Sequence, residues 1–264
     1  MMKNVFYFVL LVSLVGFMGS CKKGGGDVVV TPPPPVVPPV TPPTEIDYLK
    51  LAQQTHTFTV NNLLTSSYSY RANTTNHSNN CYEWYNVSQI YADAAMVAAG
   101  QSKHLAYMNN TFKFMDNMWD KQDSRGGYFA SVNLDGSGAG GDKYVDDNAL
   151  SGMVYLEAYE ITTGADKAAY LAKAKACGDW LISSGLWDNV YGGGFYWNTL
   201  KPEKPTQTNG LTLQLFLKLY ELTGDIQYRD WARQVESWLN SKMFDPLTGL
   251  YIWKIDGAGE GRKH

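Results

Sequence analysis

Two kinds of helical pattern alternate along the chain. Between Ala168 and Ile182, apolar side chains recur at helical spacing on one face, and lysines occupy other positions. The preceding segment, Leu150 to Ile161, is apolar on nearly all sides, which predicts a helix that is buried against several neighbours. We therefore predict hairpins in which a buried inner helix is paired with an amphipathic outer helix.

This hairpin pattern recurs three times. The glycines that mark the turn between the two helices are Gly100, Gly164 and Gly224, at intervals of 64 and 60 residues. Each unit continues into an aromatic-Asp step and a Gly-aromatic loop, and glycine at a helix end is a common C-terminal cap. One more helix is expected between Glu45 and Thr65, ahead of the first unit. The repeat predicts an all-α fold of helical hairpins stacked into a ring or solenoid.

The first 44 residues have a different composition. Residues 1–20 hold an apolar run that ends in small residues directly before Cys21, which is typical of a bacterial lipoprotein signal and predicts lipidation of Cys21. A plain secretory signal is the alternative. Residues 21–44 are rich in proline and predict an extended linker, so the globular domain is expected to span residues 45–264.

Composition excludes several classes of function. The formal net charge is -3 with no basic block, so nucleic acid is not an expected partner. The cysteines and histidines form no zinc or redox motif, so neither a metal nor a cofactor is predicted, and pairing of Cys81 with Cys177 stays open. Tyrosine and tryptophan are abundant, with 18 and 8 residues, which suits a surface that stacks on sugar rings as well as an aromatic core.

Two adjacent acids, Asp146 and Asp147, follow a glycine-rich loop and open the middle inner helix. Acids at this position commonly stabilise a helix start by accepting backbone N–H bonds. If the inner helices are parallel, however, their first turns gather at one rim of the ring. The residues expected there with the two acids are Trp84, Tyr85, Asn86, Tyr128, Trp197, Lys204 and Asn209. Acids among aromatic and amide groups favour a carbohydrate cleft over a simple helix cap.

The chain resembles glycoside hydrolase family 76, the endo-acting α-1,6-mannanases with an (α/α)6 toroid. The resemblance rests on Tyr144-Val145-Asp146-Asp147-Asn148-Ala149-Leu150, on Gly192-Gly193-Gly194-Phe195-Tyr196-Trp197, on Lys204 followed by Asn209-Gly210, and on Leu219-Tyr220-Glu221-Leu222-Thr223-Gly224-Asp225. It implies that Asp146 is the nucleophile and Asp147 the acid/base of a retaining reaction, in which two carboxyl groups flank the scissile bond.

The resemblance also implies roles for the residues at the rim. Trp84, Tyr85 and Trp197 are expected to stack on sugars, with Tyr128 beside them, and Lys204 and Asn209 to bind hydroxyl groups. The substrate would be α-mannan, and the chain would be a monomer that is lipid-anchored in the bacterial cell envelope, at the outer membrane or the cell surface.

Six hairpins of about 60 residues need about 360 residues, so this chain is expected to supply only three to four hairpins of the ring. A non-catalytic, glycan-binding surface lipoprotein is the alternative from another class. A different toroid enzyme, such as an epimerase or an unsaturated-glycuronyl hydrolase, is a third possibility. Epimerases commonly rely on histidine pairs, which the predicted inner helices lack.

Overall fold

The computed structural model describes residues 46–75, 78–258 and 262–263 of the chain. The predicted signal segment, Cys21 and most of the proline-rich linker lie outside the described residues. From Asp47 onward the chain forms one compact unit. Within the described part, no helix is both long enough and apolar enough to cross a membrane.

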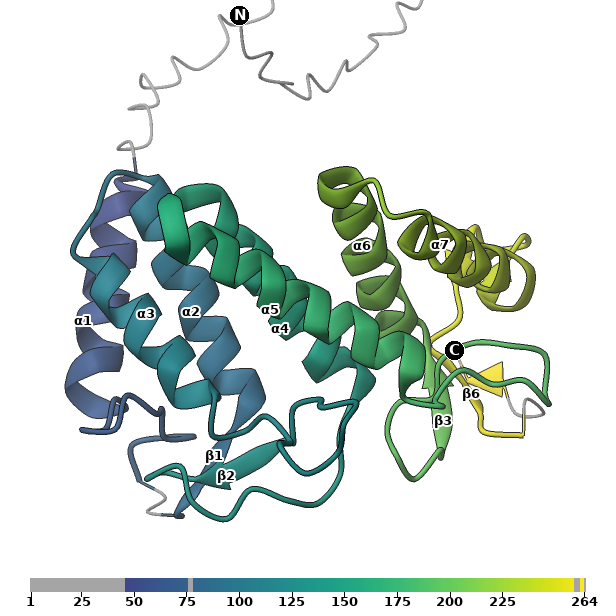
Figure 1. The fold of residues 1–264 in the computed structure, drawn as a ribbon, viewed down its shortest axis with the longest axis horizontal. Helices are drawn as coiled ribbons and strands as arrows, with labels where there is room; N and C mark the ends of the chain where they lie inside the picture. Colours follow the sequence, from purple (N-terminus) through teal and green to yellow (C-terminus); the bar gives the residue numbers. More distant parts are fainter. Residues whose placement is uncertain (1–45, 76–77, 259–261, 264) are drawn as a thin grey trace, which may run out of the picture. The chain divides into compact units, whose positions relative to one another are not determined.

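The compact unit is built of helical hairpins that lie side by side in an arc (Figure 1). A leading helix precedes three hairpins, as the sequence repeat predicts, so the all-α prediction is confirmed. The helices are α1 (Tyr48–Asn62), α2 (Glu83–Ala98) with α3 (His104–Met115), α4 (Val145–Ile161) with α5 (Gly164–Ser183), and α6 (Thr206–Thr223) with α7 (Ile226–Trp238). A short π-helical turn, Leu239–Met243, continues α7.

Burial is greatest in the middle inner helix, α4. Eleven of the 17 residues of α4 are buried, against six of the 20 residues of its partner α5. Helix α4 packs against α2 on one side and α6 on the other. Seven of the 16 residues of α2 and six of the 18 of α6 are buried. The middle inner helix is thus covered on both flanks, as its all-round apolar sequence predicts.

Close packing between the inner helices depends on a glycine. A Cβ atom built on Gly152 of α4 would lie 2.6 Å from Cδ2 of Leu215 on α6. Such a contact is far shorter than van der Waals separation, so any larger residue would push the two helices apart. The core between the layers is rich in aromatic side chains. Phe112 of α3, for example, stacks on Tyr155 of α4 with ring centroids 4.4 Å apart.

Short strands, which the sequence pattern did not predict, hold the beginnings of the inner helices at one end of the unit. The strands are β1 (Asn80–Tyr82), β2 (Ser131–Asn133), β3 (Glu203–Pro205), β4 (Phe244–Asp245), β5 (Leu250–Tyr251), β6 (Lys254–Asp256) and β7 (Arg262–Lys263). Antiparallel pairs form between β1 and β2, β3 and β6, β6 and β7, and β4 and β5.

The strand pairs follow the repeat. Each segment that leads into an inner helix pairs with the chain that follows the next outer helix: β1 with β2 before α2, Tyr144 with Asn198 before α4, and β3 with β6 before α6. These pairings lie at the lower side of Figure 1. They bring the first turns of α2, α4 and α6 to the same end of the unit.

Candidate active site

The two acids lie in the first turn of α4. The helix begins at Val145, five residues before the apolar run on which its prediction rests, so both acids are helical residues. The cap position is held by Tyr144, in an extended conformation and without a side-chain cap bond. Asp146 Oδ1 accepts the backbone N–H of Asp147 at 3.2 Å. The acids therefore do not cap the helix, but they lie where its dipole favours negative charge.

A cleft of about 390 Å³ opens over these acids. Its lining residues are Tyr82, Trp84, Ala130, Tyr144, Asp146, Asp147, Trp197 and Gln207. Trp84, Asp146 and Gln207 are the second residues of α2, α4 and α6, and thus equivalent positions of the repeat. The structure brings Trp84 and Trp197 together with the two acids, whereas Tyr82, Tyr144 and Gln207 are lining residues that the sequence reasoning missed.

Trp197 is the direct partner of Asp146. Its indole Nε1 donates to Asp146 Oδ2 at 3.0 Å, and its ring meets the ring of Tyr144 edge-on, with centroids 5.0 Å apart. Asp146 is only 6% exposed, and burial raises its pKa, while the bonds from Trp197 and from backbone N–H groups oppose that rise.

Asp147 has a different electrostatic environment. Burial and the neighbouring charge of Asp146 raise the pKa of Asp147 well above its usual value. Unlike Asp146, Asp147 has no hydrogen bond among the causes of its shift that would lower the pKa again. Asp146 therefore ionises more readily than Asp147. Two adjacent carboxyl groups whose pKa values are raised to different extents are the kind of pairing that acid and nucleophile catalysis needs.

A third acid, Glu83, lies close to the pair and was missed by the sequence reasoning. It is the first residue of α2 and is completely buried. The hydroxyl of Ser151 on α4 donates to Glu83 Oε1. Burial and the charge of Asp147 raise the pKa of Glu83 well above its usual value. Its position in the repeat could have indicated that it lies near the pair, because Glu83 is the first residue of α2 and Asp146 is the second residue of α4.

Tyr85 lies outside the lining of this cleft. Its ring packs edge-on against Tyr82, with centroids 5.5 Å apart. It borders a separate depression with Leu63, Tyr70 and Arg71. Tyr85 therefore lies beside a cleft residue, and its direct contact with sugar stays a prediction.

The prediction that Lys204 binds substrate is wrong for this structure, because the side chain is completely buried. Its Nζ donates to Asp188 Oδ2 at 2.5 Å and to the carbonyl of Gly193 at 3.1 Å. Lys143, one unit earlier, makes the same contacts with Asp120 at 2.7 Å and with a glycine carbonyl at 2.6 Å. The lysine is thus a recurrent structural tie between the start of an inner helix and the preceding Gly-aromatic loop.

Asn209 is likewise a structural residue that holds the Gly-aromatic loop. It is fully buried, its Oδ1 accepts the backbone N–H of Phe195 at 2.7 Å, and its amide donates to the carbonyl of Phe195 at 3.1 Å. Asn148 clamps the equivalent residue, Tyr128, with bonds of 2.6 and 3.2 Å. The amide that was predicted to bind sugar hydroxyls instead satisfies a buried backbone loop.

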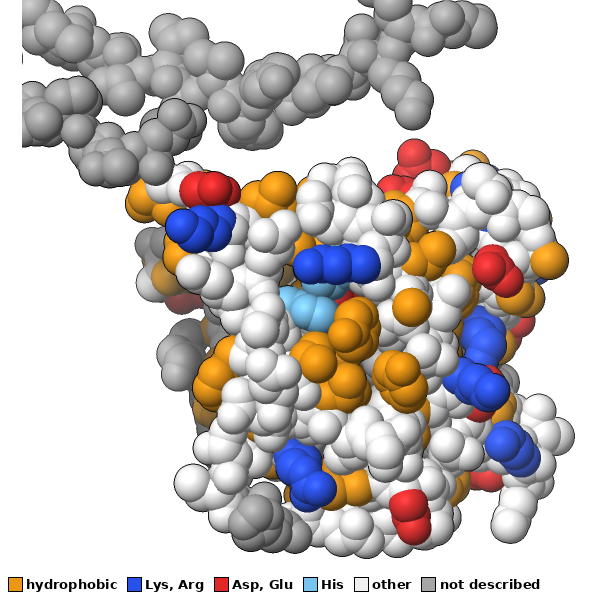
Figure 2. Space-filling model, turned by 90° about the vertical axis from the view of Figure 1, so that its left-hand side faces the viewer, with side chains coloured by type: hydrophobic (Ala, Val, Ile, Leu, Met, Phe, Trp, Pro, Cys, Tyr) orange, Lys and Arg blue, Asp and Glu red, His pale blue; other side chains and the backbone are white. Residues whose placement is uncertain are grey.

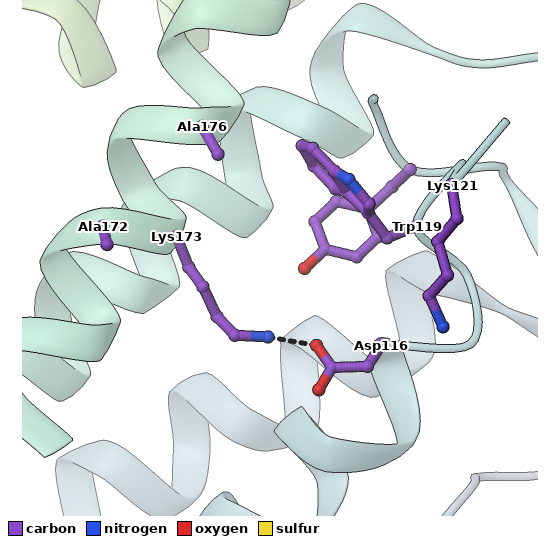
Figure 3. A pocket seen from close by; sticks show the side chains of 7 residues that line it. Asp116, Trp119, Lys121, Ala172, Lys173 and Ala176 are labelled. Carbon is purple, nitrogen blue, oxygen red and sulfur yellow. Dashed lines mark hydrogen bonds and ion pairs between the residues drawn. The ribbon is translucent and has the colours of Figure 1, made fainter. Parts of the chain in front are cut away.

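Tyr128 does not reach the cleft either. It is 2% exposed, and its hydroxyl bonds that of Tyr155 at 2.5 Å. It lies at the base of another pocket, of about 420 Å³, between α3 and α5. Figure 3 shows this pocket, with Lys173 pointing to Asp116 across it. The prediction that Tyr128 contacts substrate at the rim is therefore corrected.

Two histidines and an acid meet at the other end of α2. His56 Nε2 and His104 Nδ1 lie 3.0 and 2.7 Å from the same oxygen of Asp93. Figure 2 shows histidine side chains within a band of hydrophobic ones on this face. Because both rings approach one carboxylate oxygen, and that of His104 hydrogen-bonds it, the cluster links α1 to the first hairpin. His56 belongs to α1 and His104 to α3, so none of the inner helices α2, α4 and α6 contributes a histidine to this cluster.

A family model supports a relationship to known enzymes. The model described as glycosyl hydrolase family 76 matches residues 136–260, which include both acids of the cleft. A family 76 α-mannanase of Bacteroides thetaiotaomicron shares the fold with a TM-score of 0.70 and 25% identity, over 83% of this chain and 60% of that one. The part of the chain that holds the cleft is therefore similar to glycosyl hydrolase family 76. No protein of curated function matches it by sequence.

Two further structures share the fold of the chain. An inactive variant of an α-1,6-mannanase from Salegentibacter sp. HEL1_6, in complex with α-1,6-mannotriose, aligns with a TM-score of 0.63 and 21% identity, over 80% of this chain and 56% of that one. A cellobiose 2-epimerase from Bacillus thermoamylovorans aligns with a TM-score of 0.66 and 15% identity, over 81% and 60%. The chain thus spans 56 to 60% of the length of these structures.

Proposed function

We propose that the chain is an endo-acting glycoside hydrolase that cleaves α-1,6-linked mannan with retention at the anomeric carbon. The observation that carries the proposal is the pair of neighbouring acids in the first turn of α4, which lie in a cleft with Trp84 and Trp197. The match to the family model over residues 136–260 supports the reaction class.

The two acids divide the chemistry by their environments. Asp146, which receives the indole N–H of Trp197, attacks the anomeric carbon and forms a glycosyl-enzyme ester. Asp147 gives its proton to the departing glycosidic oxygen. In the second step Asp147 takes a proton from water, the resulting hydroxide attacks the anomeric carbon, and the ester bond to Asp146 breaks.

The cleft offers apolar faces for sugar rings beside the acids. Trp84 is 38% exposed and is available for stacking, while Trp197 combines a ring face with its bond to Asp146. Gln207 adds an amide that can bond hydroxyl groups. Trp84 and Trp197 are kept from the sequence prediction, Gln207 is added, and the buried Tyr128, Lys204 and Asn209 are no longer proposed as contacts for substrate.

The choice of linkage is supported by the structural relatives. In the Salegentibacter α-1,6-mannanase, two inactive variants have two adjacent aspartates replaced: the asparagine variant is in complex with α-1,6-mannotriose and the alanine variant with α-1,6-mannotetrose. Asp146 and Asp147 are the adjacent aspartates in the cleft of this chain. We therefore propose the same linkage for its substrate.

The test uses the purified chain with unbranched α-1,6-mannan and, as a control, a β-1,4-mannan. We expect new reducing ends and mixed short oligosaccharides only from the α-linked polymer. The variants Asp146→Asn and Asp147→Asn should each lower the rate by at least about a hundredfold. Binding without product by the unaltered chain would instead support the glycan-binding alternative, and product unaffected by both substitutions would refute the roles of the acids.

We also propose that the protein is a lipoprotein of the bacterial cell envelope, anchored through Cys21. The support is the apolar segment that ends in small residues at this cysteine. Metabolic labelling with a radioactive fatty acid tests the proposal. The expected result is label in the intact sequence and none in a Cys21→Ser variant, and equal labelling of both would contradict it.

A further inference from the structure

Glu83 is a buried acid that the proposed mechanism does not use. It projects from the first turn of α2 toward α4 and is completely buried. Ser151, which binds it through its hydroxyl, is also fully buried and lies four residues after Asp147. Residues four apart on a helix lie on the same face, about 5–6 Å apart at Cβ. Glu83 is therefore fixed against the face of α4 that carries Asp147.

The two oxygens of Glu83 are not equivalent. Oε1 accepts the hydroxyl of Ser151, whereas Oε2 is buried and has no hydrogen-bond partner among the described residues. A buried carboxylate without donors is costly, but a protonated carboxyl with its hydrogen on Oε2 carries no charge. The geometry thus leaves one O–H group available for a nearby acceptor.

The groups that face Glu83 support a neutral state. Asp146, Asp147 and Tyr155 on α4 and Cys177 on α5 are the titratable groups that interact with it. The acids repel a negative charge on Glu83. Burial raises the pKa of both Tyr155 and Cys177 and keeps them neutral, and neither side chain has a cationic form that could compensate. No basic group offsets the charge of an ionised Glu83 in this set.

We propose that Glu83 is a positioning residue that stays protonated and directs its O–H toward Asp147, to stabilise the carboxylate that Asp147 becomes after it protonates the leaving group. The inference rests on the proposed function. The proton that Asp147 gives away moves to the glycosidic oxygen, and the proton of Glu83 remains on the Glu83–Asp147 pair. Oε2 has no hydrogen-bond partner within the described part of the resting structure, so its O–H is free to bond Asp147 when the charge develops there and favours the transition state more than the ground state.

Two substitutions of Glu83 separate a neutral donor from a negative charge. Glu83→Gln keeps an oxygen for Ser151 and places an N–H donor where the O–H was, so kcat and the basic limb of the pH profile should remain near those of the unaltered chain. Glu83→Met removes the donor, so kcat on α-1,6-mannan should fall about tenfold and the basic limb should move up by about one pH unit. If Glu83 were ionised, both variants would move the basic limb down, which would overturn the proposal.

A titration that needs no activity completes the test. With ¹³C-labelled carboxyl groups, the NMR signal that is lost in Glu83→Gln belongs to Glu83. We expect this signal to stay at its protonated position through pH 7. Titration near the ordinary glutamate value of about 4.3 would overturn the inference even if mannan is cleaved. A chain that leaves mannan intact while Glu83 stays protonated would instead refute the proposed function.

Discussion

The indole Nε1 of Trp197 donates to Oδ2 of Asp146 at 3.0 Å, across 51 residues of sequence. This bond joins the Gly-aromatic loop of one unit to the first turn of its inner helix. A donor aimed at a carboxylate favours its ionised form, so it distinguishes Asp146 from its neighbour Asp147. The division of labour between two chemically identical side chains follows from this contact.

Trp197→Phe keeps an aromatic ring but removes the donor. Because the N–H bond lowers the pKa of Asp146, its loss should move the acidic limb of kcat/KM to higher pH by about one unit, with about a tenfold lower value at the optimum. Trp231→Phe on the outer helix α7 is the matched control and should leave the limb in place. An unchanged limb in Trp197→Phe would contradict this role.

Trp84→Ala tests stacking in the cleft. Loss of the exposed ring should raise KM for mannan about fivefold, equivalent to about 1 kcal/mol, with a smaller change in kcat. Tyr48→Ala, which removes a 73% exposed aromatic ring on α1, is the control and should leave KM unchanged. Equal effects of both substitutions would refute a specific contact at Trp84.

Lys204→Met tests the corrected role of this lysine. The substitution leaves Asp188 buried without its cation, which should cost about 3–5 kcal/mol of unfolding free energy and lower Tm by about 10 °C. Burial raises the pKa of Asp188, but the bonds from Lys204 and from backbone N–H groups outweigh it, so the net pKa is lowered. This ion pair therefore contributes stability above about pH 4, and the contribution is lost as pH falls through the lowered pKa.

The pH dependence gives the check on Lys204. The difference in Tm between the unaltered chain and Lys204→Met should be large at pH 7 and smaller at pH 3, where Asp188 can protonate. Lys121→Met, at an exposed lysine, should change Tm little at either pH. A variant of normal stability with a raised KM would restore the substrate-binding role of Lys204.

Asp147→Asn should stabilise the fold at neutral pH. The pKa of Asp147 is raised in the folded state, so its proton is held more tightly there than in the unfolded chain, where the value is about 3.9. Stability is then lost as pH rises above about 4 through the raised pKa. By differential scanning fluorimetry we expect Tm to rise at pH 7 and to stay unchanged at pH 3. Each kcal/mol of added unfolding free energy should raise Tm by about 2–4 °C.

The control for Asp147→Asn is Asp166→Asn, which changes an exposed first-turn acid of the outer helix α5. It removes only a favourable interaction with the helix dipole and should lower Tm slightly or leave it unchanged. A loss of stability in Asp147→Asn at pH 7 would show that Asp147 is not penalised by burial in the folded state.

The hairpins and their layers could be predicted because each helix carries its own burial pattern. Helix α4 is apolar on nearly all sides because α2 and α6 cover both its flanks. The sequence from Leu150 to Ile161 is enough to predict this burial. The start of α4 at Val145 was harder to place, because polar first-turn residues interrupt the apolar period. The short strands could not be predicted, since two or three residues carry too little pattern.

The candidate site was predictable only in part. The acids and the two tryptophans could be placed by the repeat, because equivalent first turns meet at one end of the unit. The roles of Lys204 and Asn209 were wrong because a lysine or an amide at such an end can bind either substrate or its own backbone. Lys143 and Asn148 flank the two acids of α4, and Lys204 and Asn209 hold the equivalent positions at the start of α6, where there are no acids. A lysine and an asparagine that recur without the acids indicate a structural role.

The measurement that tests the central claim most directly is the intact mass of Asp147→Asn after incubation with a 2,4-dinitrophenyl α-1,6-mannobioside. This leaving group departs without acid assistance, so Asp146 should still form the ester, while loss of the base should slow its hydrolysis. We predict a chain heavier by one mannobiosyl group, with the sugar on the peptide that holds Asp146, and no adduct in Asp146→Asn. Turnover of the activated substrate without an adduct, or an adduct on another residue, would contradict the account.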